Sequence, residues 1–286
     1  ASPNSGRSSV KDQGYRSRNL AANGICMRAQ DEPFPEHIAS VVDMARKKRD
    51  SPEPSPDDVY RDRELGDLEM KGAHESKVES YFKDRVFPKP SEKNGLGRDD
   101  KLPMSRHAVP SSAETTLRVS NPAPDMLYGY SDDAFPNQLK QLFSMGDEPV
   151  ANSQLLMYPF FAIEFKGEGG SLWVATNQCL GGSASCVNIV ERLNRQLKAC
   201  KGSTVKPIDS TAFSIAMSGT EARLYVSWKH SDLDHSDLDY YVQKVRSFCL
   251  QEPQDYIEFR KHVKNIVDWG MDQRLKDIRE SLDTLW

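Results

Sequence analysis

The strongest strand pattern in the chain lies at residues 157–166, which read MYPFFAIEFK. Almost every position in this run is apolar or aromatic, so the pattern does not alternate between a buried and an exposed face. Strands that are covered on both faces have this character, and we expect a central strand here. After a turn at Glu168-Gly169-Gly170, residues 171–199 predict a long helix with Ser171 as its cap.

The remaining hydrophobic pattern divides the chain into shorter elements. Apolar residues at helical spacing predict helices at 32–50, 57–71, 74–84 and 134–145, and a helical segment over 240–285. Strands are expected at 115–120, 124–130, 211–217 and 222–228, the last two as a hairpin. Residues 87–110 are rich in Pro, Lys and Asp without periodicity, which predicts a long loop or arm.

These elements indicate a mixed α/β protein in three parts. Residues 1–22 are polar and without periodicity, and we expect a disordered tail there. Residues 23–110 should form an N-terminal helical extension and arm, which includes a first core helix near 74–84. Residues 111–286 should form the core, with C-terminal helices packed on it.

The composition restricts the classes of function. The chain has 286 residues, enough for one large α/β domain or two small ones. Its hydrophobic content of 37% and mean hydropathy of −0.66 are low for a compact domain, so part of the chain should be extended. A net charge of −4 and a pI of about 5.9 exclude a strongly basic coat. Any DNA or RNA site must therefore be local.

Cysteine usage and hydropathy bear on the compartment. The five cysteines are Cys26, Cys179, Cys186, Cys200 and Cys249. Their odd number and spacing match neither a disulfide framework nor a zinc site, so we expect free thiols in a reducing compartment. The sequence has no apolar run long enough to span a membrane, and the polar N-terminus does not resemble a signal peptide. These features predict an intracellular protein, nuclear or cytoplasmic, although the absence of an initial Met leaves a removed leader open.

Three charged side chains are expected at the ends of strands. Glu164 and Lys166 should share one face of their strand, with Phe165 on the other, because side chains alternate. Burying such a pair in an apolar strand is costly unless the pair has a role. Asp125, after Pro124 on a neighbouring strand, can supply a second carboxylate. Carboxylates bind a hard cation such as Mg²⁺, and the lysine can orient water or neutralise phosphate charge.

Pro124-Asp125, followed by Glu164-Phe165-Lys166 on a hydrophobic strand, resembles the PD-(D/E)XK nuclease superfamily. The resemblance implies a restriction-endonuclease-like mixed sheet with an αβββαβ core, to which N-terminal and C-terminal helices are added. Longer runs, among them PFPEHI, YPFFAIEFKGEGGSLWVATNQCLGGSASCVNIVERLN and AFSIAMSGTEARLYVSWKH, are similar to a filamentous-fungal group of PD-(D/E)XK nuclease-like proteins. That narrower similarity covers most of the chain from about residue 24 onward.

The superfamily resemblance also implies roles for the site residues. Asp125 and Glu164 would hold Mg²⁺ or Mn²⁺, and Lys166 would assist the attacking water. The carbonyl of Phe165 is expected to be a further metal ligand. The alternatives are that Glu164 and Lys166 form a surface ion pair at the end of a strand, and that Asp125 belongs to a turn after proline.

Many members of that superfamily add a glutamate from the first core helix and a glutamine from the helix after the lysine. By position, the glutamate is Glu79 or Glu75, with Glu79 preferred as a metal ligand, and the glutamine is Gln178. The glutamates are four residues apart and share a helix face, which can equally be a solvated face. Gln178 can equally be an ordinary helix amide.

A local basic segment could bring a nucleic acid to this chain. Between residues 192 and 206 there are five basic residues and no acidic one. Arg192, Arg195 and Lys198 follow each other at intervals of three, so they could line one helix face and contact phosphates. A solvated helix end that is favoured by the helix dipole explains them equally well.

We therefore expect a Mg²⁺-dependent nuclease that hydrolyses phosphodiester bonds, with DNA favoured as its partner and no membrane partner. One alternative is a catalytically silent nuclease fold that binds nucleic acid or protein, which the acidic pI favours. A fungal effector that uses this fold is a related alternative. A complete set of Asp125, Glu164 and Lys166 favours activity. The serines of GGSAS lack the Gly-x-Ser-x-Gly elbow of a serine nucleophile.

Overall fold

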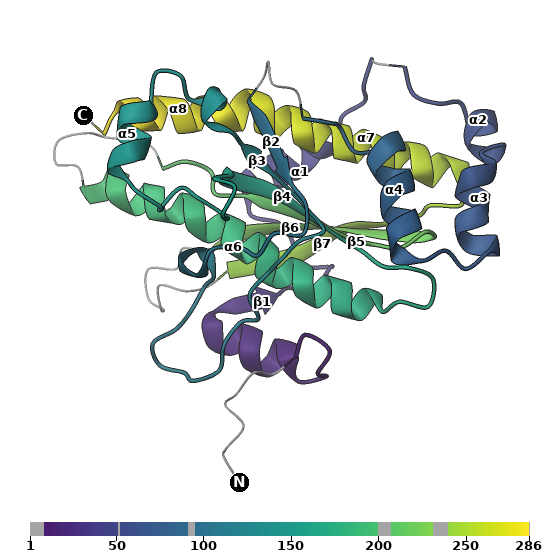
Figure 1. Ribbon diagram of the computed structural model, residues 1–286, viewed down its shortest axis with the longest axis horizontal. Helices are drawn as coiled ribbons and strands as arrows, with labels where there is room; N and C mark the ends of the chain where they lie inside the picture. The colour runs from purple at the N-terminus through teal and green to yellow at the C-terminus, as the bar shows by residue number, and fades with distance from the viewer. Residues whose placement is uncertain (1–8, 51, 91–94, 200–206, 231–239, 286) are drawn as a thin grey trace, which may run out of the picture.

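A computed structural model describes residues 9–50, 52–90, 95–199, 207–230 and 240–285 (Figure 1). Its strands are β1 (Ile25–Met27), β2 (Leu96–Asp99), β3 (Met126–Tyr130), β4 (Met157–Phe165), β5 (Ala212–Met217), β6 (Glu221–Lys229) and β7 (Tyr240–Cys249). Its α-helices are α1 (Glu36–Arg46), α2 (Pro56–Tyr60), α3 (Arg63–Met70), α4 (Glu75–Arg85), α5 (Leu139–Ser144), α6 (Leu172–Ala199), α7 (Pro253–Trp269) and α8 (Leu275–Asp283).

All of these strands belong to one mixed sheet, in the order β1-β7-β6-β5-β4-β3-β2. β4 pairs in parallel with β5 and antiparallel with β3, while β2 pairs antiparallel with β3. From α4 to β5 the main elements follow the order helix, three strands, helix, strand, with the short α5 between β3 and β4. The expectation of a mixed α/β fold is thereby confirmed.

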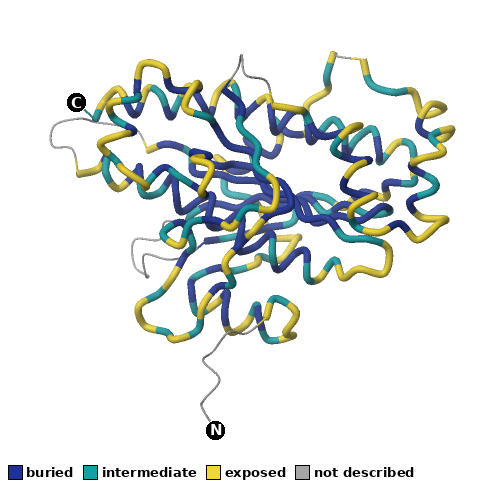
Figure 2. Tube along the Cα trace, viewed as in Figure 1, coloured by how far each residue is buried: buried dark blue, intermediate teal, exposed yellow. Residues whose placement is uncertain are grey.

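Helices cover both faces of the sheet. The long α6 crosses one face, with α7 and α8 in line above the other face and α4 near the start of α6 (Figure 1). The strands are buried in the centre of this arrangement, and the exposed residues lie on the outer helices and loops (Figure 2). Every residue of β4 is buried, as its unbroken apolar pattern predicts.

A bulge in β4 decides which side chains face α6. The pairing with β3 shifts between Tyr128 and Tyr130, so the alternation on β4 changes phase at its start. Beyond the bulge, Phe161 stacks on Tyr128 on the face away from α6. Ala162 lies instead on the α6 face, where Gly182 of the helix approaches it. Glu164 has the same phase as Ala162, so it also faces α6.

Three expectations about secondary structure were wrong. Residues 240–249 were expected to be helical, but they form β7. The same apolar residues are aromatic or β-branched at several positions, and pairing along the whole length of β6 outweighs their helical spacing. Residues 115–120 form no strand, and the expected arm at 87–110 contributes β2 to the sheet.

The N-terminal part is more closely joined to the core than we expected. Residues 1–8 lie outside the described residues, but Arg16–Leu20 is a π-helical turn, and Tyr15 and Leu20 are buried. This part of the predicted tail is therefore ordered. β1 and β2 come from residues 23–110 and pair with β7 and β3, so no boundary at residue 110 separates two bodies.

The expected free thiols are found where the structure describes them. Cys179 and Cys186 are buried, Cys26 is half-buried, and Cys249 is exposed. Cys179, Cys186 and Cys249 have free thiols, while Cys200 lies outside the described residues. Among the described helices, none combines the length and apolar character that crossing a bilayer requires.

Candidate functional site

The register of β3 on β4 brings the two predicted carboxylates together. The strands are antiparallel, and Met126 pairs with Ile163. One step outward, this register places Asp125 opposite Glu164. Directly opposed residues on one face of an antiparallel pair have their Cβ atoms about 4.5–5.5 Å apart. The two carboxylates are therefore neighbours on the face of the sheet that α6 covers.

Both carboxylates are buried, but only Asp125 accepts a hydrogen bond from the backbone. Asp125 is 7% exposed, and its Oδ2 accepts a hydrogen bond of 2.7 Å from the backbone N–H of Phe165. Glu164 is 2% exposed, and its Oε2 has no hydrogen-bond partner. An unpartnered buried carboxylate oxygen is costly, so this atom points to a missing cation or proton.

The electrostatics of the pair follow from this burial. Burial, and then the negative charge of Asp125, raise the pKa of Glu164 well above its ordinary value. Burial also raises the pKa of Asp125, although the Phe165 N–H and Lys166 oppose this effect. Two carboxyl groups so close together cannot both ionise readily unless a positive charge lies between them. The pair is thus suited to hold one proton or one cation.

Lys166 lies on the same face as Glu164 and is held at the beginning of α4. Its Nζ donates to the carbonyl of Phe165 at 2.7 Å and lies 3.6 Å from a carboxylate oxygen of Glu75. The contact depends on Gly167, because a Cβ there would come within 2.7 Å of the backbone nitrogen of Glu75. The glycine lets the end of β4 touch the first turn of α4, so Glu75 becomes a third carboxylate at the site.

Glu79, which was preferred over Glu75, is already neutralised. Its two carboxylate oxygens accept hydrogen bonds from Lys83 at 2.5 Å and from Lys101 at 2.7 Å. Burial alone would raise the pKa of Glu79, but these two lysines bring it below its ordinary value. Glu75, in contrast, acts electrostatically on both Asp125 and Glu164. The structure thus brings Glu75 to the acidic pair and gives Glu79 two cationic partners.

Lys101 is a cation at the site that the sequence did not indicate. Its backbone N–H donates to the carbonyl of Pro124 at 2.9 Å, which fixes it beside Asp125. Its φ angle is +58°, a conformation that is rare for residues other than glycine. No motif marks this residue, since only the pairing of the segment after β2 with Pro124 places it there.

Gln178 is half-buried on α6, one turn before Gly182, which packs near Pro124. No hydrogen bond of its side chain is found among the described residues. Cys179, the next residue, is buried close to Glu164, and burial raises the pKa of its thiol well above the ordinary value. A neutral, buried thiol is a packing group here and not a nucleophile.

The predicted basic face of α6 lies far from the carboxylates. Arg192 is roughly 20 Å along the helix axis from Cys179, at about 1.5 Å per residue. Its guanidinium binds both carboxylate oxygens of Glu148 and the carbonyl of His107, so it joins α6 to two loops. Arg195 and Lys198 are exposed. The structure therefore does not bring these three residues to Asp125 and Glu164.

No cluster of three or more His, Cys, Asp or Glu side chains suited to a metal ion occurs among the described residues. The side chains that would hold an ion at this site are the opposed carboxylates of Asp125 and Glu164. The carbonyl of Phe165 and water would have to complete its coordination. Magnesium is commonly bound in this way, through one or two carboxylates with several waters retained.

Comparison with known proteins assigns the chain to a family but gives no activity for it. Neither the curated proteins nor the solved structures yielded a match to it. Residues 68–282, which include α4, the β2–β7 strands, α6 and most of α8, match one family model. Because this match spans well over half of the sequence, the chain belongs to the family described as a domain of unknown function, DUF7924.

Proposed function

We propose that this protein is a divalent-metal-dependent nuclease of the PD-(D/E)XK type, which hydrolyses phosphodiester bonds. The observation that carries the proposal is the buried pair of Asp125 and Glu164, with the unpartnered Oε2 of Glu164. An apolar sheet has no structural use for two opposed carboxylates, because each raises the cost of ionising the other. A divalent cation between them removes that cost.

The residues of the site fit the roles that such a reaction needs. Asp125 and Glu164 would hold Mg²⁺ or Mn²⁺, with the carbonyl of Phe165 as a backbone ligand. When bound, the ion would polarise the phosphate and lower the pKa of a water molecule. Lys166 can leave the Phe165 carbonyl, to which it now donates, and hold the attacking water or the phosphate oxygen.

Glu75 is a better candidate than Glu79 for the additional glutamate of the site. Its side chain is 43% exposed and lies 3.6 Å from Lys166, so it can turn toward a metal or a metal-bound water. Moving Glu79 would instead break its contacts with Lys83 and Lys101. Gln178 stays a supporting residue in the proposal, since it lies on the side of α6 that faces the Pro124 segment.

The order of the elements supports the same type of fold. Helix α4, strands β2, β3 and β4, helix α6 and strand β5 follow the αβββαβ order of the proposed superfamily. In this arrangement Glu164 lies on β4, Asp125 lies immediately before the neighbouring strand β3, and the lysine lies immediately after β4. The order of the elements and the chemistry of the side chains are separate arguments. Both point to Asp125, Glu164 and Lys166.

A nucleic-acid substrate, with DNA favoured, belongs to the proposal because the chemistry of the site suits a phosphodiester. Lys101 is 53% exposed beside the carboxylates and can contact a backbone phosphate. The chain as a whole is acidic, with a net charge of −4, so binding must rely on a few local contacts.

A catalytically silent module is the second candidate, and a specific observation favours it. The most basic segment of α6 is remote from the carboxylates, and Arg192 is engaged by Glu148. A nucleic-acid or protein partner could then bind this fold without being cut. The same assay separates the two candidates.

The test is cleavage of supercoiled plasmid, circular single-stranded DNA and an RNA oligonucleotide with Mg²⁺ or Mn²⁺. We expect Lys166→Met and Glu164→Gln to lower the rate by about 10²–10³-fold, since each removes a group that acts on the transition state. Lys276→Met, on exposed α8, is the matched control and should cut like the wild type. Pure wild-type protein that cuts none of the substrates would leave the silent module as the answer, and equal cleavage by Lys166→Met would show that this site does not carry the reaction.

A further inference from the structure

An exposed aromatic ring and an arginine lie together at the start of α6. Trp173, the second residue of this helix, is 38% exposed, and the guanidinium of Arg16 lies over its ring at 3.7 Å from the centroid. The side-chain oxygen of Asn177, one turn further along α6, accepts a hydrogen bond of 2.5 Å from Arg16. The N-terminal segment, which lies beside α6 and β1, thus holds a cation against one face of the ring (Figure 1). The exposed part of Trp173 stays open to a second planar group.

Arg16 also borders a hollow whose walls carry cations and no carboxylate. The hollow has a volume of about 670 Å³ beside the edge strand β1, and its charged lining residues are Arg16, Arg28 and Lys244. Arg28 is paired with Glu32 at 2.7 Å. Neither Arg16 nor Lys244 forms an ion pair within the part of the chain that the structure describes. The unpaired positive charge makes the hollow suited to an anion.

The two unpaired cations lie near each other on one side of the sheet. A guanidinium nitrogen of Arg16 lies 3.5 Å from the sulfur of Met27 on β1, and Met27 pairs with Val242 on β7. Lys244 is two residues further along β7, so it has the same phase as Val242 and faces the same side. Two residues of a strand extend over about 7 Å. Arg16 and Lys244 can therefore contact neighbouring phosphates of one ligand.

The same face of the sheet connects these cations with the acidic pair. Glu164 pairs with Ala216 on β5, and Ala216 pairs with Arg223 on β6, so Glu164 and Arg223 are two strand spacings of about 4.8 Å apart. Burial lowers the pKa of Arg16, and the charge of Arg223 acts in the same direction, which places the two guanidiniums close together. Arg223 is itself paired with Glu221 at 2.6 Å. Arg16 and the hollow therefore carry the unpaired charge nearest to Glu164 on this side.

An aromatic face beside unpaired cations is suited to a single strand of nucleic acid. The phosphates of such a strand bind to cations, and its unpaired bases stack on aromatic side chains. The bases of a duplex are stacked on one another, so they cannot stack on Trp173. An acidic peptide would contact the cations but would leave the ring unused.

We propose that Trp173, Arg16 and Lys244 bind a single strand of nucleic acid, with one base stacked on Trp173 and phosphates at Arg16 and Lys244. The strand extends from the acidic pair past the start of α6 to the hollow beside β1. The inference rests on the proposed nuclease function in one respect, because the bound strand is taken to be the substrate. It narrows that substrate to a single strand or to a duplex with a single-stranded end.

The experiment measures binding by fluorescence anisotropy, with chelator present so that no strand is cut. The labelled probes are a ten-nucleotide oligothymidylate, the same sugar-phosphate backbone without bases, and a duplex of the same length. The wild type should bind oligothymidylate about tenfold more tightly than the abasic strand, because only the former has bases that can stack. Polyglutamate of equal charge should not displace oligothymidylate. Full displacement would indicate an acidic protein partner and would overturn the proposal.

The variants should respond selectively. Trp173→Ala should weaken oligothymidylate about tenfold and leave the abasic strand and the duplex unchanged, while Trp173→Phe keeps a ring and should retain most of the affinity. Lys244→Met should weaken both single-stranded probes and reduce the slope of log affinity against log salt by about 0.7. Phe143→Ala, which removes another exposed aromatic ring, and Lys276→Met are the matched controls and should bind like the wild type.

Binding and cleavage are measured separately, so the two proposals can fail separately. Protein that binds oligothymidylate with this selectivity but cuts nothing with Mg²⁺ would contradict the nuclease and leave the strand-binding surface in place. Three results would overturn the strand-binding surface: no binding of oligothymidylate, equal weakening of all probes by Trp173→Ala, or the same affinity in the variants and their controls.

Discussion

Asp125 and Glu164 are unusual because each makes the other harder to ionise. Asp125 has a backbone N–H donor at 2.7 Å, whereas the Oε2 of Glu164 has no partner. A buried carboxylate oxygen without a partner destabilises the ligand-free protein. Ionisable groups in such unfavourable surroundings are common at sites that bind a ligand. We therefore expect both protonation of Glu164 and metal binding to Glu164 to change the stability of the protein.

Replacing Glu164 by Gln should remove a pH dependence of stability. The pKa of Glu164 is raised in the folded state, so its stabilising contribution is present below the unfolded pKa of about 4.3. That contribution is lost as the pH rises through the folded pKa. In metal-free buffer at pH 8, Glu164→Gln should therefore be more stable than the wild type by about 1–3 kcal/mol.

Thermal unfolding between pH 4 and pH 8, with chelator present, measures this effect. A difference of this size corresponds to about 2–4 °C per kcal/mol in a chain of this length. The wild type and Glu164→Gln should approach each other toward pH 4, where Glu164 is protonated in the folded state and mostly protonated in the unfolded state. A difference that is the same at both ends of the range would rule out titration of Glu164 as its cause.

Part of the site could be read from residue spacing, and part could not. The alternation along a strand predicts that Glu164 and Lys166 share a face. Asp125 faces Glu164 only through the register of β3, which no local pattern specifies. Spacing alone could not decide between Glu75 and Glu79 for a similar reason. Both occupy one side of α4, and the decision depends on which turn of that helix meets the end of β4.

At the scale of elements, the junction between β4 and α4 assembles the site. Gly167 leaves room for the backbone of Glu75, and the N–H of Glu168 donates to the carbonyl of Ala73 at 2.9 Å. These contacts hold the lysine after β4 against the first turn of α4. The site thus depends on a close approach between two backbones, which a single methyl group would prevent.

Gly167→Ala should loosen this junction. The added Cβ would come within 2.7 Å of the Glu75 backbone nitrogen, so we expect a loss of about 1–3 kcal/mol in unfolding free energy. Gly66→Ala is the matched control, because a Cβ at that helical position of α3 meets nothing within 4 Å. That substitution should instead stabilise the protein by about 0.5–1 kcal/mol. Urea unfolding of both variants gives the comparison, and equal stability changes would contradict the proposed role of Gly167.

The helices and strands could be predicted from the sequence where a single hydrophobic pattern was long and unambiguous. β4 has an unbroken apolar run, and α6 has a long amphipathic pattern, so both were placed almost to the residue. β7 was mistaken for a helix because its apolar residues also fit helical spacing. A register shift at Leu224 on its partner β6 disturbs the simple alternation between the strands. The short β1 and β2 have too few residues to form a pattern at all.

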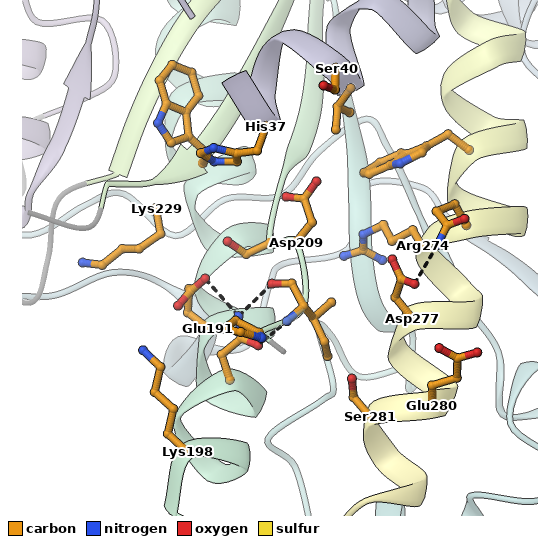
Figure 3. A pocket seen from close by; sticks show the side chains of 18 of the residues that line it. His37, Ser40, Glu191, Lys198, Asp209, Lys229, Arg274, Asp277, Glu280 and Ser281 are labelled. Carbon is orange, nitrogen blue, oxygen red and sulfur yellow. Dashed lines mark hydrogen bonds between the residues drawn. The ribbon is translucent and has the colours of Figure 1, made fainter. Parts of the chain in front are cut away.

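At the scale of the whole molecule, the two halves of α6 border different regions of the fold. Its first half covers the acidic pair of the proposed nuclease centre, and Glu191 and Lys198 in its second half line a cavity (Figure 3). The cationic residues that suggested a phosphate-binding face belong to the second half. Arg192 supports the fold through Glu148, and Lys198 lines the cavity. Charge along the sequence could show that these residues cluster, but not which site they serve.

The central claim is that Asp125 and Glu164 form a divalent-cation site. The most direct measurement is Mn²⁺ binding at pH 7.5, followed by electron paramagnetic resonance of the free ion. The wild type and the control Asp67→Asn should each bind one Mn²⁺ per chain. Asp125→Asn and Glu164→Gln should bind it about tenfold more weakly or not at all, because each removes one of two carboxylate ligands. Undiminished Mn²⁺ binding by both variants would contradict the claim.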